Sequence, residues 1–181
     1  MGSAFVRSSA HRKLSETIDM QPYPHSYVAA AAADSGGNVT VTSPQLPNIE
    51  TQTPPQFGGP GGMWSPETLL CASVADCFIL TFRALTRAAR LEWFHLECRV
   101  EGVLERAERL LQFTRYTTFA TLTVPTGTDA VKARELLERA EHSCLIANSL
   151  RGARALNAQV IVTGESTRRT GQQSGQWDAR A

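Results

Sequence analysis

The chain has 181 residues, 42% of them hydrophobic, and a net charge of +1, which together favour one domain with its own hydrophobic core. No lysine or arginine occurs between Leu14 and Phe82, so the basic surface of a nucleic-acid-binding protein is not expected. The N-terminus lacks the apolar stretch of a secretory signal, and we therefore expect a cytoplasmic protein whose four cysteines are reduced.

Three regions of the chain differ in composition. Residues 1–22 show no sustained hydrophobic period and are predicted to form a flexible arm. Residues 23–164 contain the periodic segments and are predicted to form the domain. Residues 165–181 are polar, with Gly, Gln and Arg, and are predicted to be a disordered tail.

The first ordered segment is predicted to be a small sheet. A run of small residues from His25 to Ala33 ends in the turn cluster Asp34–Asn38, and Val39–Thr42 then alternates as a strand does. Ile49–Gln52 can add a third strand. The stretch Pro54–Gly62 lacks the Gly-Lys-Ser/Thr ending of a phosphate-binding loop, so we interpret it as a connector.

The central element is a helix predicted from Ser65 to Arg90. Ser65 is a favoured N-cap, Pro66 suits the first helical position, and Glu67 places a negative charge in the first turn. Leu69–Phe82 is apolar almost all round, which predicts burial on most sides. This run is shorter than the roughly 18 residues of a membrane span, so we expect a core helix and no membrane contact.

Strands and helices alternate after the long helix. Phe94–Leu104 and Leu110–Val124 are predicted to be strands joined as a hairpin, because β-branched and aromatic residues recur in them with strand periodicity. Two predicted helices follow, Asp129–Glu141 and Cys144–Arg151, and then a last strand, Ala158–Thr163. This order predicts an α+β fold, with antiparallel sheets and the long helix at the centre.

The four cysteines differ in their surroundings. A free cysteine on a buried helix is most often an inert packing residue, so its position alone does not make Cys77 reactive. Cys144 is better placed, because the N-terminus of a helix stabilises a thiolate. We interpret Cys71 and Cys98 as packing residues. The chain contains no C-x-x-C or H-x-x-x-H spacing, so no metal site is expected.

Two motifs carry a resemblance to a known family. SPETLLCASVADCF at 65–78 and HSCLIANSL at 142–150, with the order of elements above, resemble the osmotically induced and organic hydroperoxide resistance proteins (OsmC/Ohr) over roughly residues 25–163. In that family a Pro-Glu pair opens the long helix, a peroxidatic cysteine followed by an aromatic residue lies further along it, and a second cysteine opens a later helix. The matching positions here are Pro66-Glu67, Cys77-Phe78 and Cys144.

The resemblance implies a thiol-dependent peroxidase with Cys77, Cys144 and Glu67 as catalytic residues. In the mechanism it implies, the Cys77 thiolate attacks an organic hydroperoxide, the sulfenic acid condenses with Cys144, and an external dithiol reduces the disulfide. No cofactor is required. Glu67 and Cys77 are ten residues apart, about 15 Å along a straight helix, so a site that uses both needs a broken helix or a second copy. We therefore expect an intertwined homodimer with sites at the subunit interface.

The first hairpin departs from the family pattern. Family hydroperoxidases usually carry an arginine there that pairs with the glutamate and the reactive thiolate, whereas Ser35–Asn38 reads SGGN. A cation for Cys77 would have to come from Arg83, Arg87 or Arg115, or from a partner subunit. The missing arginine favours an alternative, an OsmC-fold protein without peroxidase activity that binds a small apolar ligand or a partner.

Overall fold

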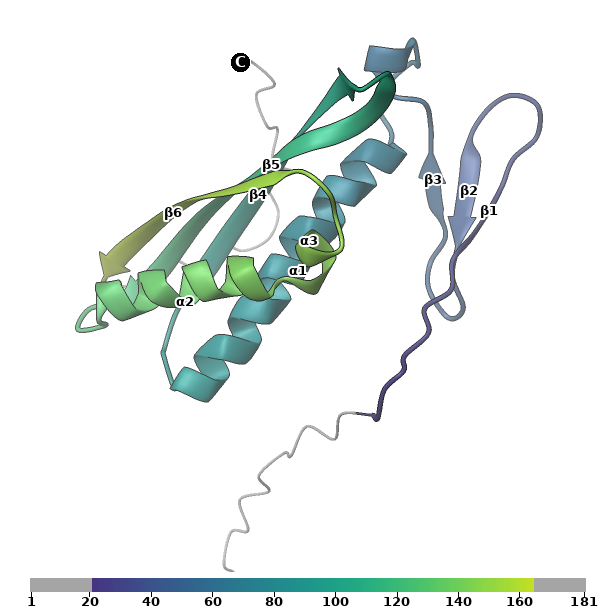
Figure 1. Ribbon diagram of the computed structural model, residues 1–181. Helices are drawn as coiled ribbons and strands as arrows, with labels where there is room; N and C mark the ends of the chain where they lie inside the picture. Colours follow the sequence, from purple (N-terminus) through teal and green to yellow (C-terminus); the bar gives the residue numbers. More distant parts are fainter. Residues whose placement is uncertain (1–20, 165–181) are drawn as a thin grey trace, which may run out of the picture.

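The computed structural model describes residues 21–164, which form two β-sheets and three α-helices (Figure 1). The predicted tail at 165–181 and all but the last two residues of the predicted arm at 1–22 lie outside the described residues. Residues 21–164 have the predicted α+β order: a small sheet, the long helix, a hairpin, two helices and a last strand.

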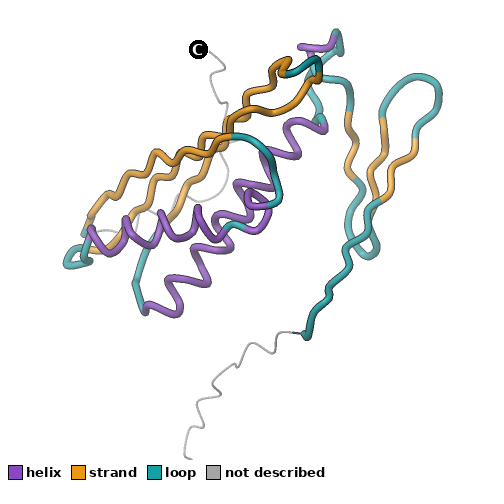
Figure 2. The backbone as a smooth tube through the Cα atoms, in the orientation of Figure 1, coloured by secondary structure: helices purple, strands orange, loops and turns teal. Residues whose placement is uncertain are grey.

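The smaller sheet stands apart from the rest of the described chain (Figures 1 and 2). Its strands β1 (Ala30–Ala32), β2 (Val39–Thr42) and β3 (Ile49–Thr51) are antiparallel in the order β1-β2-β3. A bridge between Thr51 and Trp64 links β3 to the start of the long helix. Thr51 is the one strand residue of this sheet that is buried. Three such short strands bury too little surface to be stable on their own.

The long helix α1 (Pro66–Ala89) begins and ends where the sequence predicts. The Ser65 side chain accepts a hydrogen bond from the Thr68 N–H and the Thr68 side chain accepts one from the Ser65 N–H, which forms a capping box. The buried residues of α1 recur at intervals of three or four and so lie on one stripe: Val74, Cys77, Phe78, Phe82 and Thr86.

The prediction that α1 is buried on most sides is wrong for a single chain. Leu80, in the middle of the helix, is 52% exposed. By length and composition α1 also suits a membrane span, since one 18-residue window has a mean hydropathy of 1.6 and only 22% of it is buried. The buried stripe packs on the larger sheet as a core helix does. Leu80 therefore leaves an apolar side of α1 open in the single chain.

The larger sheet has the order β4-β5-β6 and is mixed. β4 (His95–Ala107) and β5 (Leu110–Pro125) are antiparallel, and the turn residues Glu108 and Arg109 between them have the positive φ angles of a tight hairpin, 50° and 70°. β6 (Ala153–Thr163) runs parallel to β5, because the intervening helices return the chain to the same end of the sheet. The predicted last strand, Ala158–Thr163, is the second half of β6.

Two helices connect β5 to β6. In α2 (Ala130–Ser143) the Asp129 side chain caps the first turn by accepting hydrogen bonds from two backbone N–H groups. α3 (Leu145–Asn148) is a single turn, shorter than the predicted helix 144–151. α1 and α2 lie on one face of the larger sheet (Figure 1). The core between them includes Phe78, Phe82, Leu122, Val124 and Leu137.

Candidate functional site

The two cysteines predicted to react lie together between α1 and α3. The Sγ atom of Cys144 lies 3.9 Å from the backbone oxygen of Val74, and Cys77 and Cys144 belong to the same buried cluster. Cys77 is 9% exposed and Cys144 is 1% exposed. The apolar cluster around them consists of Val74, Val100, Ile146, Ala147 and Leu150. The fold thus places the pair in one buried cluster that is shielded from water.

The surroundings of Cys144 disfavour its thiolate. Burial raises the pKa of the Cys144 thiol to about 11; the N–H of Ala147 opposes the rise and the neighbouring Cys77 thiol adds to it. Cys144 has an extended backbone and precedes α3 rather than opening it. The N–H groups of Ile146 and Ala147 at the start of α3 favour the thiolate, as expected of a helix N-terminus, but burial outweighs them.

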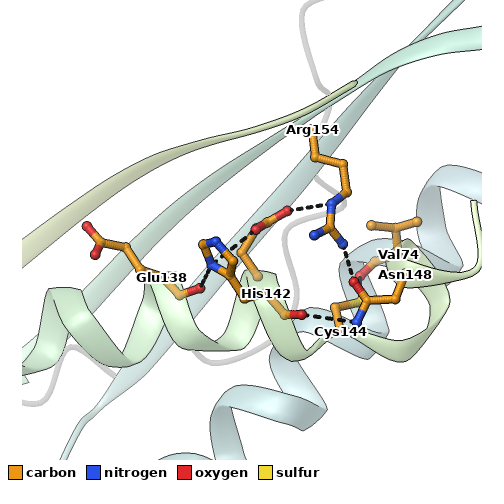
Figure 3. A network of polar contacts seen from close by, with 7 residues as sticks. Val74, Glu138, His142, Cys144, Asn148 and Arg154 are labelled. Carbon is orange, nitrogen blue, oxygen red and sulfur yellow. Dashed lines mark hydrogen bonds and ion pairs between the residues drawn. The ribbon is translucent and has the colours of Figure 1, made fainter. Parts of the chain in front are cut away.

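A polar network closes the loop that carries Cys144 (Figure 3). Arg154 on β6 forms an ion pair with Glu141, with 3.2 Å between Nε and Oε1, and donates from Nη1 to the Asn148 side-chain oxygen. Asn148 donates from Nδ2 to the backbone oxygen of His142 at 3.0 Å, and its N–H donates to the backbone oxygen of Cys144 at 2.9 Å. These contacts tie α2, α3 and β6 together around the second cysteine.

The sequence analysis did not identify Arg154 or Glu141 as part of a site. Arg154 lies in Ala153–Asn157, the half of β6 that the sequence pattern did not predict. Its contact with Glu141 joins β6 to α2, and no sequence pattern relates a residue of one element to a residue of the other. Asn148 belongs to the motif HSCLIANSL, which was the available signal for this loop.

A cavity of about 10 Å³ lies beside Cys144. It is at the lower limit of the space that one water molecule needs. Tyr116, Glu141 and Arg154 line it together with Cys144. On the other side of the Glu141–Arg154 ion pair, an open depression of about 380 Å³ reaches the surface beside His142. The ion pair therefore separates the interior next to Cys144 from solvent.

Glu67, the third predicted site residue, does not lie with the cysteine pair in one chain. It is ten residues before Cys77 on the unbroken helix α1, a rise of about 15 Å. Its Oε2 atom is buried and has no hydrogen-bond partner among the described residues, an unfavourable state for a carboxylate. Glu67 lines an open groove of about 1000 Å³, whose other walls are α1, the β4–β5 hairpin and the turn Pro55–Phe57.

Cys71 and Cys98 line this same groove. Burial raises the pKa of both thiols, to about 12 for Cys98, where nearby Cys144 adds to the rise. These environments agree with packing roles. Residues 21–164 contain no group of three or more His, Cys, Asp or Glu side chains arranged to hold a metal ion.

The three arginines proposed from the sequence as cations for Cys77 do not reach it. Arg83, Arg87 and Arg115 are all exposed. Within the described part of the chain, the Cys144 thiol contacts the Val74 backbone oxygen, and no arginine contacts either thiol. One arginine, Arg154, lines the same small cavity as Cys144.

Comparison with known proteins gives one family. Residues 59–158 match the family described as OsmC-like protein. Among curated proteins, the uncharacterized protein YmaD of Bacillus subtilis is 26% identical over 117 aligned residues, with coverage of 62% of this chain and 78% of YmaD.

Solved structures show the same fold. One is an organic hydroperoxide resistance protein OsmC from Legionella pneumophila, with a TM-score of 0.62, 24% identity, and coverage of 78% of this chain and 100% of that one. Another is an OsmC-like protein of unknown function from Vibrio cholerae, with a TM-score of 0.68, 15% identity, and coverage of 75% of this chain and 100% of that one. At these identities the likeness establishes the fold.

Proposed function

The chain belongs to the OsmC-like protein family, and we propose that it is a thiol-dependent peroxidase that reduces organic hydroperoxides through Cys77 and Cys144. The observation that best supports the proposal is the burial of both cysteines in one cluster, because a sulfenic acid on one can then meet the other without a change of fold. The name of the Legionella pneumophila relative, an organic hydroperoxide resistance protein, agrees with it.

In the proposed reaction Cys77 is the peroxidatic residue. Its thiolate attacks the terminal oxygen of the hydroperoxide, the O–O bond breaks, and the leaving alkoxide takes a proton to become an alcohol. Cys77 is then a sulfenic acid, and the Cys144 thiolate displaces its hydroxide to form a disulfide and water. An external dithiol reduces this disulfide and is itself oxidised, which restores both thiols. No cofactor takes part.

The apolar surroundings of the pair favour an organic substrate. Val74, Val100 and Ile146 surround the two thiols with aliphatic carbon. An alkyl or aryl group gains from contact with such walls, whereas hydrogen peroxide has no apolar part to bury. An external dithiol as reductant and a cytoplasmic location belong to the same proposal, since a reducing cytoplasm keeps the resting cysteines as thiols.

A homodimer is the proposed active form. The open apolar side of α1, the small sheet and the Glu67 carboxylate each lack a partner surface within the described chain. A second copy placed along the 1000 Å³ groove would cover Glu67 and the side of α1 that carries Cys71, Ala72 and Ala75. In that arrangement Glu67 of one copy would serve the Cys77 site of the other, since the length of α1 keeps the two residues apart in a single chain.

The test is a single-turnover reaction with cumene hydroperoxide. The reduced wild type should consume one equivalent and form a disulfide, and Cys77→Ser should consume none. Cys144→Ser should consume one equivalent and accumulate a sulfenic acid that dimedone traps. Cys71→Ser and Cys98→Ser are matched controls and should behave as the wild type. Equally slow consumption by the wild type and Cys77→Ser would remove the peroxidase proposal.

A separate observation supports a second candidate function. No arginine contacts the thiols in the described chain, and the groove that Trp64, Ala72 and Phe113 line is open and largely apolar. These features suit a protein without peroxidase activity that binds a small apolar ligand or a partner. Stoichiometric binding of an apolar fluorescent dye that Ala72→Arg abolishes, together with no hydroperoxide consumption, would select this function.

A further inference from the structure

We propose that Arg154 assists the ionisation of Cys144 in the disulfide-forming step, and that Glu141 restrains this effect by offsetting the charge of the guanidinium. The inference rests on the thiol chemistry proposed above. In that step the Cys144 thiol loses its proton and its Sγ attacks the sulfur of the Cys77 sulfenic acid. The S–S bond forms, the S–O bond breaks, and the leaving hydroxide takes up a proton to become water.

Arg154 is held where a developing negative charge on Cys144 would feel it. Both residues line the 10 Å³ cavity. The side chain of Glu141 is 12% exposed and that of Arg154 is 27% exposed, although Arg154 as a whole residue is exposed. A charge that is partly removed from water acts more strongly than one that water surrounds. Two contacts, to Glu141 and Asn148, fix the orientation of the guanidinium (Figure 3).

Charged and titratable groups approach Cys144 from five neighbouring elements. They are Cys77 on α1, Cys98 on β4, Tyr116 on β5, Glu141 and His142 on α2, and Arg154 on β6. The cysteines and the tyrosine are acids, and their ionisation can only oppose a second negative charge. His142 has a side chain that is 78% exposed and a ring bonded to the Glu138 backbone oxygen. Within residues 21–164, Arg154 is thus the less exposed of the two basic groups at this site.

Glu141 explains why Arg154 does not already favour the thiolate in the resting protein. Its carboxylate lines the same cavity and pairs with Arg154 at 3.2 Å, so the two charges largely cancel at Cys144. The burial that raises the pKa of Cys144 to about 11 then prevails. Removing one member of the pair should therefore change Cys144 in the opposite direction from removing the other.

The experiment measures alkylation of Cys144 by iodoacetamide in the fully reduced protein between pH 7 and 9.5. The tryptic peptide Ala140–Arg151 contains Cys144 and no other cysteine, so mass spectrometry reports this thiol alone. Arg154→Gln should slow labelling about tenfold at each pH, a displacement of about one pH unit. Glu141→Gln should accelerate it several-fold. Arg154→Lys keeps the charge and should restore most of the wild-type rate.

The opposite signs separate a charge effect from a structural one. Both substitutions break the same ion pair and open the same wall, so altered access or loss of packing would move the two rates together. Arg134→Gln is the matched control, because Arg134 also joins α2 to β6, through the Ala158 backbone oxygen at 2.8 Å, and should leave the Cys144 rate unchanged.

Changes in the same direction for Arg154→Gln and Glu141→Gln, or no change in either, would overturn the proposal. If Arg154→Gln does not fold, Glu141→Gln decides alone, and a slower or unchanged rate counts against it. The measurement uses no hydroperoxide. Its failure would leave the peroxidase test at Cys77 untouched, and an inactive wild type would not alter the labelling result.

Discussion

The Sγ atom of Cys144 lies 3.9 Å from the backbone oxygen of Val74, one turn of α1 before Cys77. This contact docks the second cysteine directly on the helix that carries the first. A disulfide needs Cα atoms within about 7 Å of each other, and the position of both cysteines in one buried cluster makes the required movement small.

Mild oxidation should therefore form one specific bridge. Treating the reduced protein with one equivalent of hydroperoxide is expected to join Cys77 to Cys144 and to leave Cys71 and Cys98 as thiols. Trypsin alone keeps Cys71 and Cys77 in one peptide, because no Lys or Arg lies between them, whereas cleavage before Asp76 separates them. Mapping after both digestions identifies the pair. A bridge that contains Cys71 or Cys98 would show that the cysteines are wrongly assigned.

Asn148 should matter more for stability than its exposed position suggests. Its side chain donates to the His142 backbone oxygen and accepts from Arg154, so Asn148→Ala removes two hydrogen bonds and should lower the free energy of unfolding by roughly 1–3 kcal/mol. Urea denaturation measures this. Ser149→Ala is the control, because the Ser149 hydroxyl donates only to the Leu145 backbone oxygen within its own turn. Equal losses in both variants would refute a special role for Asn148.

Alkaline pH should destabilise the fold through Cys144. Its folded pKa of about 11 is above that of an unfolded thiol, about 8.5, so the folded state holds the proton more tightly. This stabilisation is fully present below about pH 8.5 and is lost as the pH rises toward 11. The free energy of unfolding of the wild type should then fall by roughly 2–3 kcal/mol more than that of Cys144→Ala over this range. Parallel pH dependences in the two proteins would contradict it.

The proposed homodimer predicts a change of mass on substitution in the groove. Ala75 lines the groove on α1, and Ala75→Arg should place a charge in the covered interface and yield a monomer at micromolar concentration. Gln159→Arg, at an exposed position on β6, should leave the mass unchanged. Light scattering distinguishes the two outcomes. A monomeric wild type would exclude the dimer directly.

The elements that could be predicted are those whose own residues indicate where they begin or which period they follow. Ser65 and Pro66 mark the start of α1, and β-branched residues at strand spacing mark β5. The first half of β6, with the sequence ARALN, has no apolar alternation, because its side chains are mostly exposed and its pairing with β5 supplies the order. The one-turn length of α3 likewise follows from tertiary packing around Cys144 rather than from helix propensity.

The cysteine pair was predictable because a family motif carries it, whereas the network behind Cys144 was not. Arg154 and Glu141 meet only after α2, α3 and β6 have assembled. Burial of α1 was overestimated for a related reason. An apolar surface in a sequence shows that something covers it, and does not show whether the cover is the same chain.

The isolation of β1, β2 and β3 has a kinetic consequence. The body made of α1, α2 and the larger sheet can form within one chain, but three strands this short persist only when something holds them. If that support is a second copy, backbone hydrogen exchange in β2 should slow as protein concentration rises, while exchange in β5 should not respond. The small sheet would then become ordered only when two chains meet, at a rate that depends on protein concentration, rather than during the folding of one chain.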